Sequence, residues 1–132
     1  MFQQFKSAGE KLFLSGVNDT HSGNISAREG EKIFITSKTA MLSSLKEEDI
    51  VKAGAEEAAG ADSEASNDLT IHRLIYKITK AQAIIHAHPP NALALCVTEN
   101  RILPQDFKGQ SLFPMGVGII KTKLGANIDE IS

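Results

Sequence analysis

Large hydrophobic residues recur with helical spacing in two parts of the chain. In Met1–Leu14 the apolar residues share one broad side, which predicts an N-terminal amphipathic helix. In Ser66–Lys80 the spacing i, i+3, i+4, i+7 is complete, which predicts the clearest helix, with Ser66 as its N-cap. A third helix is predicted over Asn91–Thr98, directly after two prolines. The four aliphatic residues with this spacing in Ser66–Lys80 are Ile71, Leu74, Ile75 and Ile78.

Short runs rich in β-branched residues predict strands between these helices. Ile25–Arg28 and Lys32–Thr36 are separated by a turn at Gly30, so together they predict a β-hairpin. Ala83–His88 predicts a buried strand that ends at Pro89-Pro90. Weaker patterns predict strands over Ile50–Val51, Ile102–Pro104 and Leu112–Ile120, and the start of a helix over Ala126–Ser132.

The order of these elements is that of one α/β domain. The chain has 132 residues, and 42% of them are hydrophobic, enough for a normal packed core. Residues 53–65 are small and acidic, with no large apolar side chain, so we expect a flexible surface loop there rather than a domain boundary. The residues before that loop are too few to form a stable core alone.

Composition and charge exclude several classes of function. The net charge is −2, from 14 Lys+Arg against 16 Asp+Glu, so the chain lacks the basic surface of a general nucleic-acid binder. Cys96 is the only cysteine, so no intramolecular disulfide forms. No apolar run has the length of a membrane span, and the N-terminal residues lack the pattern of a secretory signal. We therefore expect a soluble cytoplasmic protein.

His86 and His88 are the strongest candidates for chemistry. Residues i and i+2 of a strand point to the same face, so both imidazoles project together beside the end of the strand. Two neutral imidazoles on one rigid strand are half of a catalytic zinc site, which usually has three protein ligands. The alternative is a pair of half-buried histidines that are satisfied by hydrogen bonds. Spacing alone does not separate the two interpretations.

Polar residues elsewhere suggest a site for a charged substrate. Asp68 lies at the start of the predicted helix, where a carboxylate serves proton transfer, metal binding or only capping. Gly23 and Asn24 precede a strand and offer close backbone approach and an amide, although an ordinary turn has the same composition. The segment from Thr36 to Thr39 offers hydroxyls and the cation of Lys38 for a phosphate, as other polar loops also do.

Five segments in this order resemble the class II aldolase/adducin family, which includes L-fuculose-phosphate aldolase and L-ribulose-5-phosphate 4-epimerase. The resemblance extends from the N-terminal helix to about Ile120. Each segment is a weak signal, but five of them in order with sensible spacing form a specific one. The segments are Ser-Gly-Asn-Ile-Ser-Ala-Arg (22–28), Ile-Phe-Ile-Thr (33–36), Leu-Lys-Glu-Glu-Asp-Ile-Val (45–51), Ser-Asn-Asp-Leu-Thr-Ile-His-Arg-Leu-Ile-Tyr (66–76) and Ile-Ile-His-Ala-His-Pro-Pro (84–90).

The resemblance implies a three-layer α/β/α fold with a largely antiparallel central sheet. It also implies a divalent metal, usually zinc, and a symmetric homotetramer with active sites at subunit borders. By the same resemblance, His86 and His88 match two metal ligands and Asp68 matches the proton-transferring acid. The residues implied to bind substrate and its phosphate are Gly23, Asn24, Thr36, Lys38, Ser66 and Asn67.

The sequence departs from the family pattern at several positions. The family's third metal histidine has no counterpart after His88, which leaves His21, Asp68 or a second chain as candidates for that ligand. Lys38 and Thr39 stand where the phosphate loop usually has a hydroxyl residue and glycine. The family domain is longer, so we expect this chain to be an incomplete domain at its C-terminal end.

Three functions are compatible with these residues. The first is a zinc-dependent aldolase that cleaves a ketose 1-phosphate to dihydroxyacetone phosphate and an aldehyde, which the Pro-Pro-flanked histidine pair favours. The second is a 4-epimerase of the ribulose-phosphate type, which Asp68 and the segment Thr70–Tyr76 favour. The third is an inactive adducin-like interaction domain, against which the intact pair of His86 and His88 argues.

Overall fold

A computed structural model of the chain describes residues 1–56 and 62–121. The chain divides into two compact units, Met1–His88 and Pro89–Ser132, and each is described by itself. None of the described helices combines the length and the apolar character needed to cross a membrane.

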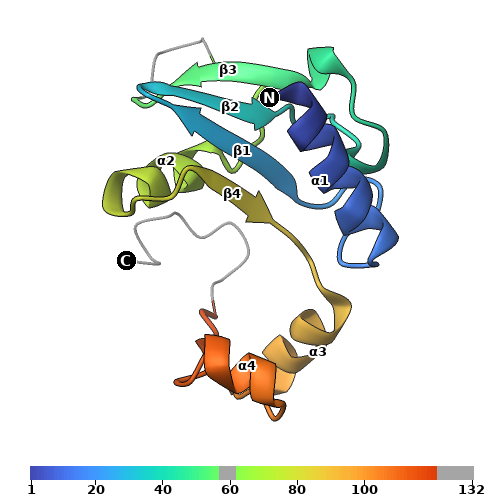
Figure 1. Ribbon diagram of the computed structural model, residues 1–132, viewed down its shortest axis with the longest axis vertical. Coiled ribbons are helices and arrows are strands. Elements are labelled where there is room, and N and C mark those ends of the chain that lie inside the picture. The colour runs from blue at the N-terminus through green and yellow to red at the C-terminus, as the bar shows by residue number, and fades with distance from the viewer. Residues whose placement is uncertain (57–61, 122–132) are drawn as a thin grey trace. The chain divides into compact units, whose positions relative to one another are not determined.

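The first unit is built on a four-stranded antiparallel sheet with the order β3-β2-β1-β4 (Figure 1). The predicted hairpin is confirmed: β1 and β2 pair through a two-residue turn in which Gly30 has a φ of 58°. β4 pairs with the other edge of β1, so that Asn24 lies opposite His86. The strands are β1 (Asn24–Glu29), β2 (Lys32–Thr36), β3 (Ile50–Gly54) and β4 (Ala83–His86).

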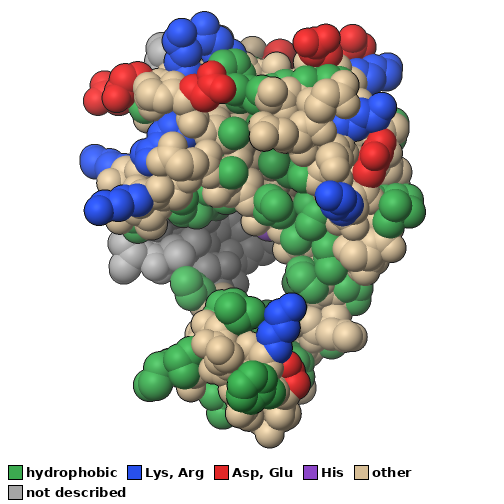
Figure 2. Space-filling model, viewed as in Figure 1, with side chains coloured by type: hydrophobic (Ala, Val, Ile, Leu, Met, Phe, Trp, Pro, Cys, Tyr) green, Lys and Arg blue, Asp and Glu red, His purple; other side chains and the backbone are tan. Residues whose placement is uncertain are grey.

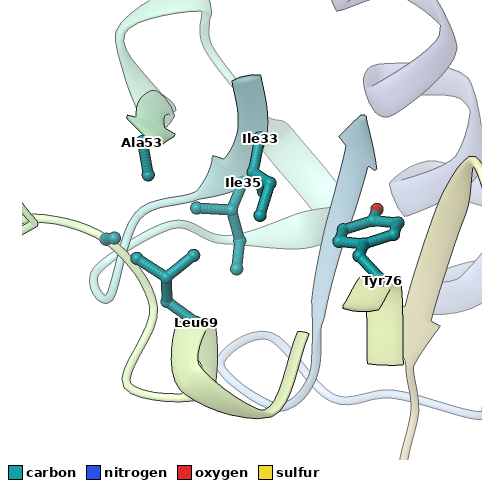
Figure 3. Close-up of a cluster of buried hydrophobic side chains, with 6 residues drawn as sticks. Ile33, Ile35, Ala53, Leu69 and Tyr76 are labelled. Atoms are coloured by element: carbon teal, nitrogen blue, oxygen red, sulfur yellow. The ribbon is translucent and has the colours of Figure 1, made fainter. Parts of the chain in front are cut away.

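Helices cover both faces of this sheet and give the three layers that were expected. α2 (Leu69–Ile78) packs on the face formed by Ile33 and Ile35 (Figure 3). α1 (Phe2–Leu14) packs on the opposite face, where Phe5 contacts a second cluster with Ile25, Leu42 and Leu45. Alternate residues of one strand therefore fill two different cores, which is the expected consequence of the period-2 alternation of side chains.

Short elements complete both units. The 3₁₀ turns η1 (Leu42–Ser44) and η2 (Glu47–Asp49) connect β2 to β3. The second unit contains α3 (Pro90–Thr98), β5 (Arg101–Ile102), α4 (Phe107–Leu112) and β6 (Val117–Gly118), and β5 pairs antiparallel with β6. No residue between 89 and 121 is buried, and large hydrophobic side chains of this unit are exposed (Figure 2).

Several predicted boundaries in the first unit differ from the structure. α2 begins at Leu69, so its N-cap is Asp68 and not Ser66. β4 ends at His86, because the N–H of His88 bonds to the loop that follows α1 and not to the sheet. The strand predicted at Ile50–Val51 extends to Gly54, since β2 offers it backbone partners as far as Lys32.

The predicted surface loop over 53–65 begins and ends in ordered structure. Ala53 belongs to β3, and Ala65 is buried and forms a bridge to Ser37. The middle of that loop, 57–61, lies outside the described residues, as does the helical start predicted over 126–132.

The strand predicted over Leu112–Ile120 is largely wrong. Only Val117–Gly118 is extended, and α4 occupies the residues before it. The side chain of Asp106 accepts a hydrogen bond from the N–H of Gly109 at 2.9 Å, which caps a short helix that lacks an amphipathic pattern.

Candidate active site

A polar cleft of about 250 Å³ lies where β1 begins and β4 ends. It brings together side chains from the loops after α1 and β2, from the start of α2 and from the exit of β4. Its lining residues are His21, Ser22, Gly23, Asn24, Ser37, Lys38, Ala40, Ser66, Asn67, Asp68, His86 and His88. Most of the predicted site residues therefore share one cleft.

The two histidine rings converge at this cleft. The Nε2 atoms of His86 and His88 lie 3.0 Å apart, and the ring centroids are 4.7 Å apart with an interplanar angle of 39°. In a tetrahedral zinc site with Zn–N bonds of about 2.0–2.1 Å, two ligand nitrogens are separated by about 3.3 Å. The observed separation therefore fits two ligands of one small cation.

Asp68 supports the first of these rings. Its Oδ2 atom lies 2.7 Å from Nδ1 of His86 and accepts a hydrogen bond of 2.6 Å from Nδ2 of Asn24. Asp68 is the N-cap residue of α2, but its side chain makes no capping bond there and bonds to His86 and Asn24 instead. An ionised carboxylate fixes the proton of His86 on Nδ1, which leaves the Nε2 lone pair available to a metal.

The ionisation of Asp68 follows from its surroundings. Burial alone raises the pKa of this carboxyl, but the hydrogen bonds from Asn24 and His86 lower it more. The pKa therefore lies below the ordinary value of 3.8, and Asp68 is a carboxylate at neutral pH.

A buried hydrogen-bonded cluster holds α2, and with it Asp68, against β1. The Oγ atom of Ser26 lies 2.7 Å from Nδ1 of His72 and 2.7 Å from the hydroxyl of Tyr76. Ser26 is fully buried, and Arg28 donates to the carbonyl of Tyr76 at 2.8 Å. Burial lowers the pKa of His72 and raises that of Tyr76, so both side chains are neutral at pH 7. His72 is thus a structural residue, outside the cleft lining.

Gly23 occupies a position that no other residue fits easily. Its φ is +75°, and a Cβ atom there would lie 2.3 Å from the carbonyl oxygen of His86 and 2.4 Å from Nδ2 of Asn18. Asn18 is a site neighbour that the sequence analysis missed. It sits in an ordinary polar loop, and no periodicity or spacing distinguishes it from Asp19 or Thr20.

Thr36 is the predicted site residue that the structure does not bring to the cleft. It is 1% exposed, and its hydroxyl accepts a hydrogen bond from the N–H of Ile25 at 3.2 Å. Thr36 follows Phe34 by two residues in β2, so both side chains point to the face of the sheet that α1 covers. Asp68 and His86 lie on the opposite face. In the described structure Thr36 therefore does not line the cleft with the other residues predicted to bind phosphate.

The other predicted phosphate residues do line the cleft. Lys38 contributes its side chain, and its ammonium donates to the carbonyl of Ser63 at 2.7 Å and to Glu64 at 3.3 Å. Ser66 and Asn67, which precede Asp68 in the sequence, line the same cleft. Three of the implied phosphate contacts are therefore available in one place.

Within residues 1–56 and 62–121, the candidate metal donors that converge at the cleft are two, His86 and His88. No group of three or more His, Cys, Asp or Glu side chains in that part of the chain is arranged to hold a metal ion. Asp68 contacts Nδ1 of His86, on the side of the ring away from Nε2, so it supports a ligand and does not add one. His21 lines the same cleft.

Comparison with known proteins identifies the family. A family model described as Class II Aldolase and Adducin N-terminal domain matches residues 3–130. The chain belongs to this family. Its α/β fold with an antiparallel central sheet is the class II aldolase fold: L-fuculose-1-phosphate aldolase from Thermus thermophilus matches with a TM-score of 0.81 and 32% identity over 90% of this chain.

Other relatives extend this class II aldolase likeness. An aldolase II superfamily protein from Pseudomonas syringae shares the fold, with a TM-score of 0.67 and 19% identity over 83% of this chain and 47% of its own. A probable bifunctional methylthioribose-1-phosphate isomerase/methylthioribulose-1-phosphate dehydratase from Nocardia farcinica is 29% identical over 92 residues, 67% of this chain. The chain spans 61% of the Thermus protein and 17% of the Nocardia protein.

Proposed function

We propose that this class II aldolase domain belongs to a divalent-metal-dependent lyase that cleaves a ketose 1-phosphate to dihydroxyacetone phosphate and an aldehyde. The observation that carries the proposal is the convergence of Nε2 of His86 and His88 at 3.0 Å, with Asp68 behind the first ring. The 32% identity to L-fuculose-1-phosphate aldolase over 90% of the chain supports a substrate of that class.

The residues of the cleft suit a retro-aldol step. In that reaction the C4 hydroxyl loses its proton, the C3–C4 bond breaks, and its electron pair forms an enediolate that is then protonated at C3. His86 and His88 would hold a divalent cation, which would supply Lewis-acid stabilisation of the developing charge. Asp68 is ionised, so it begins the cycle as a proton acceptor and returns the proton afterwards.

Substrate binding is assigned to the polar loops of the cleft. The sharp turn at Gly23 lets the main chain approach a ligand, and Asn24 lies beside Asp68. Lys38, Ser66 and Asn67 offer a cation, a hydroxyl and an amide for the phosphate. Asp68 is the only carboxylate in the described lining of the cleft, and it is bonded to His86.

The proposal is tested by zinc titration and product analysis on matched histidine variants. The wild-type chain is expected to bind zinc stoichiometrically and to release dihydroxyacetone phosphate from L-fuculose 1-phosphate. His86→Ala and His88→Ala are expected to lose both properties. His21→Ala tests the remaining candidate for a third ligand in the same cleft, and Glu64→Gln, whose carboxylate pairs with Lys38 at the surface, is the control. Zinc retained in His88→Ala contradicts the assignment.

A second candidate reaction is dehydration of a phosphorylated ketose. The 29% identity to the Nocardia dehydratase over 67% of the chain favours it. The same assay separates the reactions, because dehydration removes water without releasing a three-carbon phosphate. Inversion at C4 of L-ribulose 5-phosphate would identify an epimerase, and zinc-free inactive protein would identify an adducin-like domain.

The proposal also includes assembly and location. We propose a cytoplasmic homotetramer with sites at subunit borders, since a second chain is one possible source of a third ligand. Light scattering with and without zinc tests the assembly, and a stable monomer that binds zinc tightly would contradict it.

A further inference from the structure

Asn18 connects the loop after α1 to the end of β4. It is 5% exposed, and its Oδ1 atom accepts a hydrogen bond from the backbone N–H of His88 at 2.8 Å across 70 residues of sequence. The same N–H lies 3.0 Å from the carbonyl oxygen of Val17. Because His88 lies beyond the last residue of β4, these two acceptors take the place of a strand partner.

The amide of Asn18 is poorly explained by stability alone. Its Nδ2 atom is buried and has no hydrogen-bond partner among the described residues. A buried donor without a partner lowers stability, and a hydrocarbon side chain of similar size would avoid that loss. A Cβ atom on residue 23 would lie 2.4 Å from this Nδ2 atom, so the amide packs directly against Gly23.

The two rings of the histidine pair are held in different ways. The ring of His86 is bonded to Asp68 through Nδ1. In the part of the chain that the structure describes, the ring of His88 makes a hydrogen-bond contact only with the ring of His86. The direction of the His88 side chain therefore depends on its backbone, and that backbone is held by the side chain of Asn18 together with the carbonyl of Val17.

We infer that Asn18 is a positioning residue, which fixes the main chain at His88 so that the Nε2 atoms of His86 and His88 converge. Its hydrogen bond goes to the backbone N–H of His88 and not to an imidazole ring, so it acts through the peptide of His88. The significance of this convergence for metal binding rests on the proposed function. The convergence itself is a property of the metal-free chain and is measured separately.

Three variants of the full chain test the inference. Asn18→Leu removes the acceptor and preserves the bulk, Asn18→Asp restores the acceptor, and Leu45→Ala creates a cavity in the core beside α1 as a control for general destabilisation. The metal-free measurements are the nuclear Overhauser effect between the ring protons of His86 and His88 and the hydrogen exchange of the His88 amide. The metal-dependent measurement is a calorimetric titration with zinc.

In Asn18→Leu we expect loss of the ring-to-ring effect, exchange of the His88 amide about tenfold faster, and zinc binding weaker by roughly tenfold or more. Asn18→Asp is expected to keep the ring-to-ring effect, and its amide exchange rate and zinc affinity are expected to stay within about threefold of the wild type. Leu45→Ala is expected to keep the ring-to-ring effect and the zinc affinity.

An unchanged ring-to-ring effect in Asn18→Leu, or an equal loss in Leu45→Ala, would overturn the inference. A wild-type chain that binds no zinc would overturn the proposed function instead, and the two metal-free measurements would still decide the role of Asn18.

Discussion

Oδ2 of Asp68 lies 2.7 Å from Nδ1 of His86, and this contact joins the N-cap of α2 to the last residue of β4. The same oxygen accepts from Asn24, the residue opposite His86 in the sheet. One carboxylate oxygen therefore links three elements at the cleft. It also gives His86 the carboxylate–imidazole arrangement that orients metal ligands in proteins.

Replacing this carboxylate is expected to weaken metal binding without removing a ligand. In Asp68→Asn the side chain keeps its size but loses the charge that holds the proton on Nδ1 of His86. We expect the zinc dissociation constant to rise roughly ten- to hundredfold, as for other partners of ligating histidines. Competition titration against a chromophoric chelator measures it.

Glu64→Gln is the matched control for Asp68→Asn. Glu64 is a carboxylate beside the cleft, but it pairs with Lys38 at the surface and does not contact either histidine. Its zinc affinity is expected to equal that of the wild type. A similar loss in both variants would attribute the effect to net charge and not to orientation of His86.

Gly23→Ala is expected to be strongly destabilising. A methyl group there meets the carbonyl oxygen of His86 and the amide of Asn18, both in closely packed surroundings, and the backbone has a φ of +75°. We expect a loss of more than about 3 kcal/mol in the free energy of unfolding, measured with urea.

Gly30→Ala is the control that separates the cost of the close contacts at Gly23 from the cost of a left-handed backbone conformation. Gly30 has a φ of +58°, but a Cβ there meets nothing within 4 Å. Its loss is expected to be about 1–2 kcal/mol, which is the penalty of the left-handed conformation alone. Equal losses at both positions would show that the close contacts at Gly23 relax freely.

His72 is expected to make stability depend on pH. Burial lowers its pKa in the folded chain below the ordinary value of 6.5, so the unfolded chain binds a proton first as the pH falls. Its contribution is complete above about pH 6.5 and is lost as the pH falls from there to the folded pKa. In His72→Asn, the decrease in unfolding free energy between pH 7.5 and 5.5 should be smaller than in the wild type.

Tyr76→Phe is the control for this pH dependence. This substitution removes the hydroxyl that bonds to Ser26, but it removes no group that titrates between pH 5.5 and 7.5. Its stability is expected to be lower at every pH, with the wild-type slope. If the unfolding free energy of His72→Asn changed with pH as much as that of the wild type, the burial of a neutral imidazole at His72 would be contradicted.

Thr36→Val tests the role of Thr36. Loss of the hydroxyl that accepts from Ile25 is expected to lower the unfolding free energy by about 1 kcal/mol. Binding of dihydroxyacetone phosphate, measured by calorimetry, should not change. Lys38→Met, at the cleft, should weaken that binding with little loss of stability. If Thr36→Val weakened the binding of dihydroxyacetone phosphate and Lys38→Met did not, Thr36 would be a phosphate ligand after all.

Local patterns in the sequence were sufficient for the elements that position the site. The i, i+3, i+4, i+7 spacing predicted α2, and the β-branched runs around Gly30 predicted the hairpin, because both signals arise within a few residues. Strand alternation also predicted the pair of His86 and His88, but β4 ends at His86, and the backbone of His88 is held by bonds to Val17 and Asn18 instead. α4 was missed because its sequence, Phe-Lys-Gly-Gln-Ser-Leu, has weak helix propensity and depends on the cap at Asp106.

The sequence by itself determined the family, the layered α/β class and the candidate histidine pair, since each depends on local spacing or on segments in a fixed order. Only the tertiary structure decided which face of the sheet each polar residue meets, because that depends on strand parity and on contacts across many residues. It placed Thr36 away from Asp68, made Asp68 at the N-cap of α2 the partner of His86, and brought Asn18 to the backbone of His88. These contacts are invisible in the sequence, since a hydrogen bond across 70 residues has no periodic signature.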